Sequence, residues 1–287
     1  MSTKISRYSA SLGYLAARGC QALQGASASP RLDAEVLLAY TAGISRSVVF
    51  AFSERTIRPE MECRYFDLIA KRVNGMLVAQ LVGKKEFYSL EFAVTADTLV
   101  PRPETELLVE KALGWIPEKA KMSILDIGTG TGCIAITAEI ENLADNIFAT
   151  DISESSIEIA KENMVLHHVE NIQFARHDFL RQNFKSNFDV VVSNPPYIAV
   201  NEMNALQTEV KDYDPPSALT DYGDGLTFYR HFSEQFDNLL KLDGYLLLEI
   251  GGGDQQDAVE SIFQNAGLNT EFFKDLQQDW RMVEVRR

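Results

Sequence analysis

The sequence predicts an α/β protein in which a doubly wound, mostly parallel sheet follows a small all-helical N-terminal domain. From residue 122 onward, short apolar strands alternate with helical patterns, as is typical of a parallel sheet covered by helices on both faces. Before about residue 76 only helical spacing of apolar residues occurs. A length of 287 residues suits one large domain and one smaller domain.

The N-terminal domain is expected over residues 1–76. Its clearest helix covers residues 31–40, where Ser29 precedes Pro30 in the order that commonly starts a helix. Further helical patterns cover residues 48–52 and 61–73. We therefore expect a short helical bundle that ends near Gly75.

A connector is expected over residues 77–100. Residues 86–94 carry aromatic and β-branched side chains in loose alternation, which predicts a hairpin-like element. The larger domain then spans residues 101–287. It opens with Pro101-Arg102-Pro103-Glu104-Thr105-Glu106, whose prolines favour an extended chain before a helix at 107–113.

The larger domain is predicted to contain seven strands and four further helices. The strands are expected at 123–127, 147–151, 172–177, 188–193, 245–250, 271–274 and 282–285. The helices are expected at 134–141, 154–167, 226–240 and 254–266. The runs 190–192 and 245–248 are apolar throughout, as in central strands that are buried on both faces.

The loop after the first strand of the larger domain is rich in glycine. It reads Asp126-Ile127-Gly128-Thr129-Gly130-Thr131-Gly132. Glycines let a backbone turn tightly and approach a ligand closely. The spacing differs from the G-x-G-x-x-G of dinucleotide enzymes, so this loop alone predicts a nucleotide-like ligand or only a tight turn.

Acidic residues follow the next two strands. Asp151 can accept hydrogen bonds from both hydroxyls of a ribose. Asp178 and Phe179 can hold an adenine through its exocyclic amine and its ring face, although an acidic helix cap and a core aromatic are the alternative. Ligands bind beyond the carboxyl ends of parallel strands, so the three loops together predict an adenosyl cofactor.

The fourth strand ends in Asn194-Pro195-Pro196-Tyr197. The Asn194 side-chain oxygen and the Pro195 carbonyl can accept both hydrogens of a planar NH₂ group, and Tyr197 can stack on the flat substrate. Acceptors that favour a pyramidal nitrogen would stabilise the transition state of methyl transfer from a methylsulfonium. The loop therefore predicts methylation of an amide or amine nitrogen, with no metal required.

Composition narrows the function classes. Cys20, Cys63 and Cys133 are scattered, and the four histidines lack metal-ligand spacing, so neither disulfides nor a metal site are expected. The net charge of −14 argues against stable nucleic-acid binding. Residues 1–75 nevertheless carry 10 Lys and Arg against 6 Asp and Glu, an excess that suggests a separate partner for this segment. No membrane span or secretory signal is evident, so we expect a cytoplasmic protein.

The sequence resembles the HemK/PrmC protein-glutamine methyltransferases along nearly its whole length. The segments that carry the resemblance occur in the family order: Pro101 to Glu106, Asp126 to Gly132, Asn194 to Tyr197, and Gly225-Leu226-Thr227-Phe228-Tyr229-Arg230. The Asn-Pro-Pro-Tyr loop is shared with adenine-modifying DNA methyltransferases, whereas its combination with the other segments is specific to the family.

The resemblance implies a class I S-adenosylmethionine-dependent methyltransferase that modifies the glutamine of the Gly-Gly-Gln motif in peptide chain release factors. It implies cofactor contacts from the Asp126–Gly132 loop, Asp151, Asp178, Phe179 and Asn194. The glutamine would lie against Asn194, Pro195, Pro196 and Tyr197. The helical N-terminal domain would dock the release factor, and Arg102 and Glu106 would support the site.

The chain departs from the family pattern at three places. It has Asp214-Pro215 where Glu-Pro is common, and Asp221-Tyr222-Gly223 where a Gly-Gly step is usual. Phe179-Leu180 reverses the frequent aliphatic-aromatic order. The alternatives are a glutamine methyltransferase acting on a ribosomal protein, a DNA adenine methyltransferase, and a non-catalytic adaptor. The acidity of residues 76–287 disfavours the DNA enzyme, and the intact loops disfavour the adaptor.

Overall fold

A computed structural model describes residues 9–115 and 122–287, which form two compact units. The first unit runs to Gly83 and also includes Gln207–Tyr213, while the second comprises Lys84–Leu206 and Asp214–Arg287. The predicted division was after residue 76. The two positions differ by helix α5 (Val78–Val82), which packs on helix α2 (Pro30–Ala42) of the first unit.

The first unit is a helical bundle with its own apolar core. Besides α5, its helices are α1 (Leu12–Leu23), α2 (Pro30–Ala42), α3 (Arg46–Ala51) and α4 (Pro59–Val73). Ser11 caps α1 by accepting a hydrogen bond from the Tyr14 backbone, and Gly43 ends α2 in the left-handed conformation. Leu15, Leu37 and other aliphatic side chains are fully buried between these helices.

A segment from the middle of the sequence completes this unit. It contains α9 (Thr208–Lys211), which the periodicity did not reveal. The guanidinium of Arg72 is buried and pairs with both Asp33 and Glu209 at 2.7 Å. The Tyr213 hydroxyl donates to the Asn74 carbonyl at 2.9 Å. These bonds pair a buried cation with two carboxylates and attach the segment to the helical bundle.

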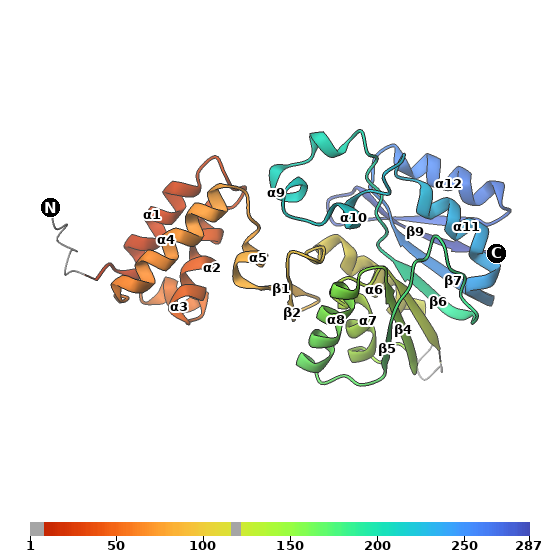
Figure 1. Cartoon of the computed structure of the whole chain (residues 1–287), viewed down its shortest axis with the longest axis horizontal. Helices are drawn as coiled ribbons and strands as arrows, with labels where there is room; N and C mark the ends of the chain where they lie inside the picture. The colour runs from red at the N-terminus through yellow and green to blue at the C-terminus, as the bar shows by residue number, and fades with distance from the viewer. Residues whose placement is uncertain (1–8, 116–121) are drawn as a thin grey trace. The chain divides into compact units, whose positions relative to one another are not determined.

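The second unit is built on a seven-stranded sheet, shown in Figure 1. Its strands are β3 (Ser123–Ile127), β4 (Asn146–Asp151), β5 (Ile172–Arg176), β6 (Phe188–Ser193), β7 (Leu240–Glu249), β8 (Asn269–Lys274) and β9 (Trp280–Arg286). The order is β5-β4-β3-β6-β7-β9-β8, in which the first five strands are parallel and β9 pairs antiparallel with both neighbours. The predicted fold class is confirmed.

Helices cover both faces of the sheet. On one face lie α6 (Glu106–Trp115), α7 (Cys133–Ile140) and α8 (Glu154–Leu166), and on the other lie α11 (Thr227–Leu239) and α12 (Gln255–Asn265) (Figure 1). Alternate strand residues serve the two faces, since Ile124 packs toward the first group and Leu125 toward the second. This explains the unbroken apolar runs of the central strands.

Strand β7 begins five residues earlier than the sequence predicted. Its first residues include Lys241, Leu242 and Asp243, which are all exposed and so lack the alternation of buried and exposed positions that is typical of a strand. The pairing with β6 also shifts register between Phe188 and Val190. Such an irregularity inserts unpaired residues and hides the start of a strand from a periodicity argument.

A hairpin precedes the sheet, in the stretch where the sequence predicted a hairpin-like connector. It consists of β1 (Lys84–Phe87) and β2 (Leu90–Ala93), joined by Tyr88 and Ser89 with positive φ angles. The Asn163 side chain of α8 bonds both the N–H and the carbonyl of Ala93 and also the carbonyl of Thr131. The hairpin is thereby attached to the glycine-rich loop.

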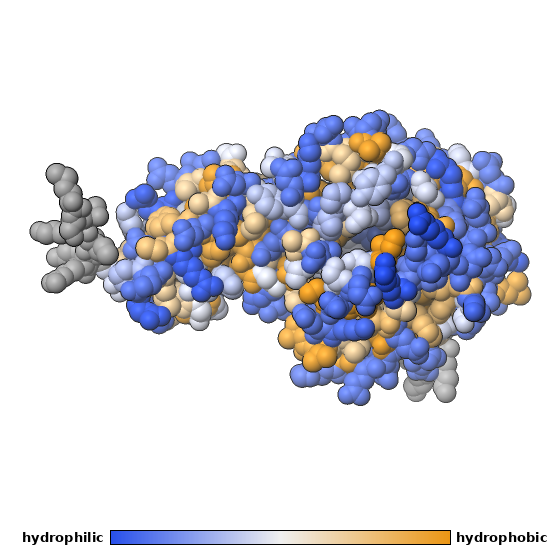
Figure 2. Space-filling view, viewed as in Figure 1, coloured by the Kyte–Doolittle hydropathy of each residue, from blue (hydrophilic) through white to orange (hydrophobic). Residues whose placement is uncertain are grey.

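Short helices connect the remaining segments: η1 (Pro103–Thr105), η2 (Met203–Ala205) and α10 (Pro216–Leu219). Hydrophilic residues cover most of the surface of the second unit on the face shown in Figure 2. Among residues 9–115 and 122–287, no helix has the length and apolar character needed to cross a membrane.

Candidate active site

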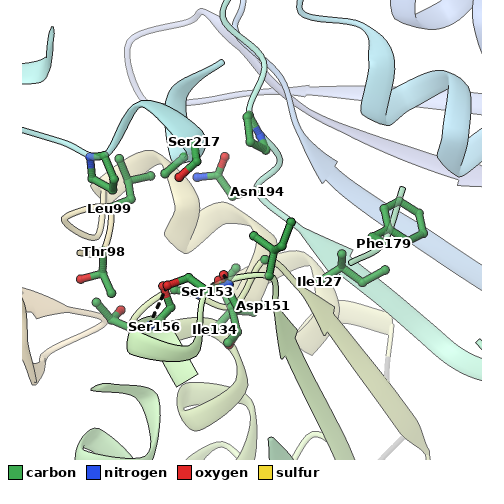
Figure 3. Close-up of a pocket in the computed structure, with 18 of the residues that line it drawn as sticks. Thr98, Leu99, Ile127, Ile134, Asp151, Ser153, Ser156, Phe179, Asn194 and Ser217 are labelled. Atoms are coloured by element: carbon green, nitrogen blue, oxygen red, sulfur yellow. Dashed lines mark hydrogen bonds between the residues drawn. The ribbon is translucent and has the colours of Figure 1, made fainter. Parts of the chain in front are cut away.

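A cavity lies where the carboxyl ends of β3, β4, β5 and β6 meet, on either side of the point where the strand order reverses. Its empty space is about 1070 Å³ when the part open to solvent is included, comparable to ligand pockets of roughly 300–1,000 Å³. Figure 3 shows Asp151 and Ser153 on one side of the cavity and Asn194 and Ser217 on the other.

The glycine-rich loop forms the floor of this cavity. Gly128, Gly130 and Gly132 all have positive φ angles, which favour glycine. A Cβ atom at Gly128 or Gly130 would meet no atom within 4 Å, so the backbone is open to a ligand there. At Gly132 a Cβ would lie 3.1 Å from the Ala160 side chain. Gly132 therefore serves packing between α7 and α8, and it is absent from the cavity lining.

Asp126 lies beneath the loop and does not line the cavity. It is fully buried and accepts a hydrogen bond from the Thr129 hydroxyl at 2.7 Å. Burial raises the pKa of this carboxyl to about 7. Thr129 itself lines the cavity, so this hydrogen bond from its hydroxyl to Asp126 fixes the orientation of a side chain in the cavity wall.

Asp151 stands at the end of β4, in the cavity wall. Its two oxygens accept hydrogen bonds at 2.9 Å from the backbone N–H groups of Gly130 and Ser153. Burial raises its pKa, while these backbone donors act in the opposite direction. The carboxylate thus connects two loops and keeps lone pairs for a ligand.

The loop after β5 brings His177, Asp178 and Phe179 to the cavity. The Phe179 ring is buried and lies edge-on to the ring of His231 at 4.7 Å between centroids. Figure 3 shows Phe179 at one end of the cavity, beyond Ile127. An apolar aromatic wall beside polar loops is the environment that a purine requires.

The Pro101–Glu106 segment contributes a further wall. Pro101, Arg102 and Thr105 all line the cavity. Arg102 forms a salt bridge of 2.5 Å with Asp214, whose side chain is completely buried. Asp214, which stands where the sequence analysis noted Glu-Pro as common, thus pairs with Arg102 of this wall.

Asn194 and Pro196 line the cavity opposite the glycine-rich loop. The Asn194 Nδ2 atom donates to the Thr105 hydroxyl at 3.1 Å. Its Oδ1 atom is then available to accept a hydrogen bond. Ser193 anchors the preceding residue by donating to the Ile127 carbonyl at 2.6 Å.

Pro195 and Tyr197 are not part of the cavity lining. Pro195 is buried, and the Tyr197 hydroxyl donates to Glu249 at 3.3 Å. Burial raises the pKa of Tyr197, so its hydroxyl stays protonated at neutral pH. Stacking of this ring on a substrate stays a prediction.

Several side chains that hold the Asn-Pro-Pro-Tyr loop were not identified from the sequence. Glu249 is fully buried and contacts both Thr105 and Tyr197. Gln255 donates to the Tyr197 carbonyl at 2.9 Å. The sequence did contain a sign of this role, since Glu249 follows the apolar run of strand β7. A carboxylate in such a position is rarely buried without a partner, so a supporting contact could have been expected.

Comparison with known proteins identifies the family. Residues 103–214 match the family described as Methyltransferase small domain, and residues 15–83 match the PrmC N-terminal domain. The release factor glutamine methyltransferase of Escherichia coli is 38% identical over 245 residues, which cover 85% of this chain and 87% of that protein. The one from Bacillus subtilis is 36% identical over 259 residues, covering 87% and 89% respectively.

The chain belongs to the release factor glutamine methyltransferase family. Among solved structures, the hMettl16 catalytic domain has a TM-score of 0.57 at 16% identity, covering 77% of this chain and 82% of that chain. This likeness shows that the two proteins share a fold. Membership of a methyltransferase family indicates S-adenosylmethionine as the methyl donor.

The residues that line the cavity fit S-adenosylmethionine. The open backbone at Gly128 and Gly130 leaves room for a ligand, Asp151 offers a carboxylate, and Phe179 offers an aromatic surface. The lining also contains the carboxylates of Asp97, Asp151 and Asp178, whose negative charge suits a positively charged sulfonium. The volume of the cavity suits an adenosyl ligand.

Proposed function

We propose that the protein methylates the side-chain amide nitrogen of the glutamine in the Gly-Gly-Gln motif of peptide chain release factors. One observation carries the proposal. Asn194 faces the glycine-rich loop and Asp151 across a single cavity, in a chain related over most of its length to release factor glutamine methyltransferases. The protein would then be a protein-(glutamine-N5) methyltransferase.

In this proposal the cofactor binds along the glycine-rich loop. Thr129, Gly130 and Thr131 contact it, and Asp126 supports them from below. Asp151 accepts hydrogen bonds from the ribose, while Asp178 and Phe179 hold the adenine. Support for these roles comes from the positions of Thr129, Asp151 and Phe179 in the cavity wall.

The glutamine amide would lie between Asn194 and the methyl group. The Asn194 Oδ1 atom and the Pro195 carbonyl accept its two hydrogens, while Pro196 and Tyr197 form the loop around it. An amide nitrogen is a weak nucleophile, because its lone pair is delocalised. Two acceptors matched to a pyramidal nitrogen lower the barrier selectively.

The chemical step needs no further group from the protein. The nitrogen lone pair forms a bond to the methyl carbon as the carbon–sulfur bond breaks, and the sulfonium leaves as a neutral thioether. The nitrogen then loses one proton to water. The task of the protein is to align the reacting atoms and to exclude competing solvent.

The first test compares substrates. The protein is incubated with labelled S-adenosylmethionine and a release factor, the same factor with Gly-Gly-Ala in place of Gly-Gly-Gln, a ribosomal protein, or duplex DNA. We expect label on the parent release factor alone. Label on the ribosomal protein or the DNA instead, or equal label on the Gly-Gly-Ala factor, would refute the proposal.

The second test removes the proposed acceptor. Asn194→Ala should reduce methyl transfer to background and leave the affinity for S-adenosylmethionine within about tenfold, because one neutral hydrogen bond contributes roughly 0.5–1.5 kcal/mol. Transfer is measured with the labelled release factor and affinity by calorimetry. Equal loss of both would assign Asn194 a purely structural role.

A further inference from the structure

Three side chains, of Asn194, Thr105 and Glu249, form a hydrogen-bonded chain that leads from the cavity wall into the interior. The Thr105 hydroxyl donates to the Glu249 carboxylate at 2.6 Å, and Asn194 donates its Nδ2 hydrogen to the Thr105 oxygen at 3.1 Å. Thr105 and Glu249 are each at most 3% exposed. Water therefore does not compete for the hydrogen bond between Thr105 and Glu249, and hydrogen bonds in such a buried environment are stronger than in water.

The direction of each bond in this chain follows from proton counting. An ionised carboxylate only accepts, so the single hydroxyl proton of Thr105 must point at Glu249. The Thr105 oxygen can then only accept, and it selects the NH₂ side of the Asn194 amide. As a result, the Oδ1 atom of Asn194 is the one left for the cavity.

The second oxygen of Glu249 holds another part of the same loop. It accepts a hydrogen bond from the Tyr197 hydroxyl at 3.3 Å, while the Glu249 backbone carbonyl accepts one from Tyr229 at 2.8 Å. One buried carboxylate thus holds Tyr197 directly and Asn194 through Thr105. Removing the carboxylate would free both residues of the loop.

We propose that Thr105 and Glu249 are positioning residues that fix the amide of Asn194 with its oxygen toward the substrate nitrogen. The inference rests on the proposed function, since it assigns the supporting residues of that site. With the amide reversed, Asn194 would present N–H donors to a substrate NH₂ group, and the transition state would lose an acceptor. Glu249 is absent from the cavity lining, and the hydroxyl of Thr105 is engaged by Glu249 and Asn194, so both residues would act through Asn194.

The ionisation state of Glu249 decides which partner donates in each hydrogen bond of the Asn194–Thr105–Glu249 chain. Burial raises its pKa to about 7, with a further upward contribution from Glu104, while the hydroxyls of Thr105 and Tyr197 and the charge of Arg281 lower it. The Tyr229 hydroxyl faces its backbone carbonyl. A protonated Glu249 can donate to Thr105, which can then donate to the Asn194 oxygen. The wrong orientation therefore becomes accessible as the pH falls through about 7.

The experiment measures methylation of a release factor by the full-length protein at saturating S-adenosylmethionine. Thr105→Val removes the hydroxyl and keeps the shape, and Thr105→Ser restores the hydroxyl. Thr137→Val is the matched control, because Thr137 is a fully buried threonine of α7 whose hydroxyl has no hydrogen-bond partner among the described residues. Cofactor affinity and the thermal midpoint are measured for each variant.

We expect Thr105→Val to lower kcat by roughly 10- to 100-fold with little change in KM or cofactor affinity, as for a misaligned reacting group. Thr105→Ser should recover kcat to within about threefold, and Thr137→Val should match the parent. A parent-like kcat for Thr105→Val would overturn the inference. So would a loss that Thr105→Ser fails to restore, which would indicate a packing role.

Glu249→Gln tests the ionisation. Its amide offers one acceptor and one donor group, as a protonated carboxyl does, so this variant mimics the low-pH form of Glu249 and has no titrating proton. Its kcat should therefore be low at every pH. The parent kcat should fall as the pH is lowered through about 7, whereas the Glu249→Gln profile should lack that step. An identical step in both proteins would contradict the assignment. Failure of the parent to methylate any release factor would instead refute the proposed function, so the two outcomes are distinguishable.

Discussion

At the scale of single residues, Asp151 illustrates how one carboxylate can serve the fold and a ligand together. It accepts one backbone hydrogen bond from Gly130 and one from Ser153, each at 2.9 Å. These bonds fix the geometry of two cavity loops. Each carboxylate oxygen can accept more than one hydrogen bond, so the group retains capacity for a ribose.

Replacing this carboxylate should weaken cofactor binding. Asp151→Asn places an amide N–H against a backbone N–H and removes the negative charge from the cavity. Hydrogen bonds to charged groups contribute about 1.5–3 kcal/mol, so the Kd for S-adenosylmethionine should rise by roughly 10- to 150-fold. Calorimetric titration measures the change.

Asp145→Asn is the control for this prediction. Asp145 is exposed and precedes β4 at the opposite end of the same strand. Its replacement removes the same charge without touching the cavity, so the Kd should stay within about twofold of the parent. Similar weakening in both variants would show that net charge, rather than the position of Asp151, governs binding.

The position of residues at the strand ends could be predicted from the sequence, whereas the contacts that support them could not. Asp151 and Asn194 were expected near one another and both line the cavity, because parallel strands bring their carboxyl ends to one edge of a sheet. Glu249 was overlooked, because its contacts with Thr105 and Tyr197 join positions 144 and 52 residues away in sequence. No local pattern encodes a contact at that separation.

At the scale of elements, one loop holds another in place. Gly225 has a φ of +79°, and a Cβ atom there would lie 2.4 Å from the Tyr197 carbonyl oxygen. Gln255 of α12 bonds both that carbonyl and the Gly225 carbonyl. The Asn-Pro-Pro-Tyr loop therefore depends on a close backbone approach that only glycine allows.

Adding a methyl group at this contact should displace the loop. Gly225→Ala is expected to lower kcat by roughly tenfold or more, because an alignment error of about 1 Å can cost 100-fold in rate. The thermal midpoint should also fall, as both the clash and the left-handed backbone destabilise the variant. Steady-state methylation and thermal unfolding measure the two effects.

Gly253→Ala separates strain from the clash. Gly253 also has a positive φ, of +56°, but a Cβ there would meet nothing within 4 Å. This variant should lose about 1–2 kcal/mol of stability through backbone strain and retain the parent kcat. If Gly253→Ala lowered kcat as strongly as Gly225→Ala, displacement of the loop could not be the cause.

At the scale of the whole molecule, the chain passes from the second unit to the first and back through Gln207–Tyr213. Within the first unit, the buried Arg72 holds this segment through Glu209, while Asp33 keeps the same guanidinium on α2. From the sequence, the N-terminal domain was expected to be one continuous segment, residues 1–76. A few residues from the middle of the chain in fact complete it.

Loss of the Glu209 contact should loosen the segment. Glu209→Ala removes a charge-assisted hydrogen bond, and because the Glu209 side chain is 27% exposed we discount its contribution to about 1 kcal/mol. Amide exchange over residues 207–213 should therefore accelerate by about fivefold. Hydrogen exchange followed by mass spectrometry measures this change.

Asp212→Ala provides the comparison for the segment. Asp212 is an exposed carboxylate of the same short stretch, so its removal should leave exchange near the parent rate. The central strands of the second unit should exchange at parent rates in both variants. Faster exchange after Asp212→Ala alone would mean that Glu209 does not hold the segment.

The sequence by itself determined the fold class, the sheet strands and the loops at their carboxyl ends. Periodicity and turn chemistry are local properties, so residues a few positions apart are enough to specify them. Six of the seven strands were predicted with bounds within two residues at each end, and β7 was not because a register shift hides its start.

Only the tertiary structure decided how those loops are held. The support of Asn194 by Thr105 and Glu249, and the attachment of residues 207–213 to the helical unit, join segments remote in sequence. Buried polar groups must find partners wherever the fold brings them, and the choice of partner depends on packing in three dimensions. The resulting hydrogen bonds give the Asn-Pro-Pro-Tyr loop one defined orientation.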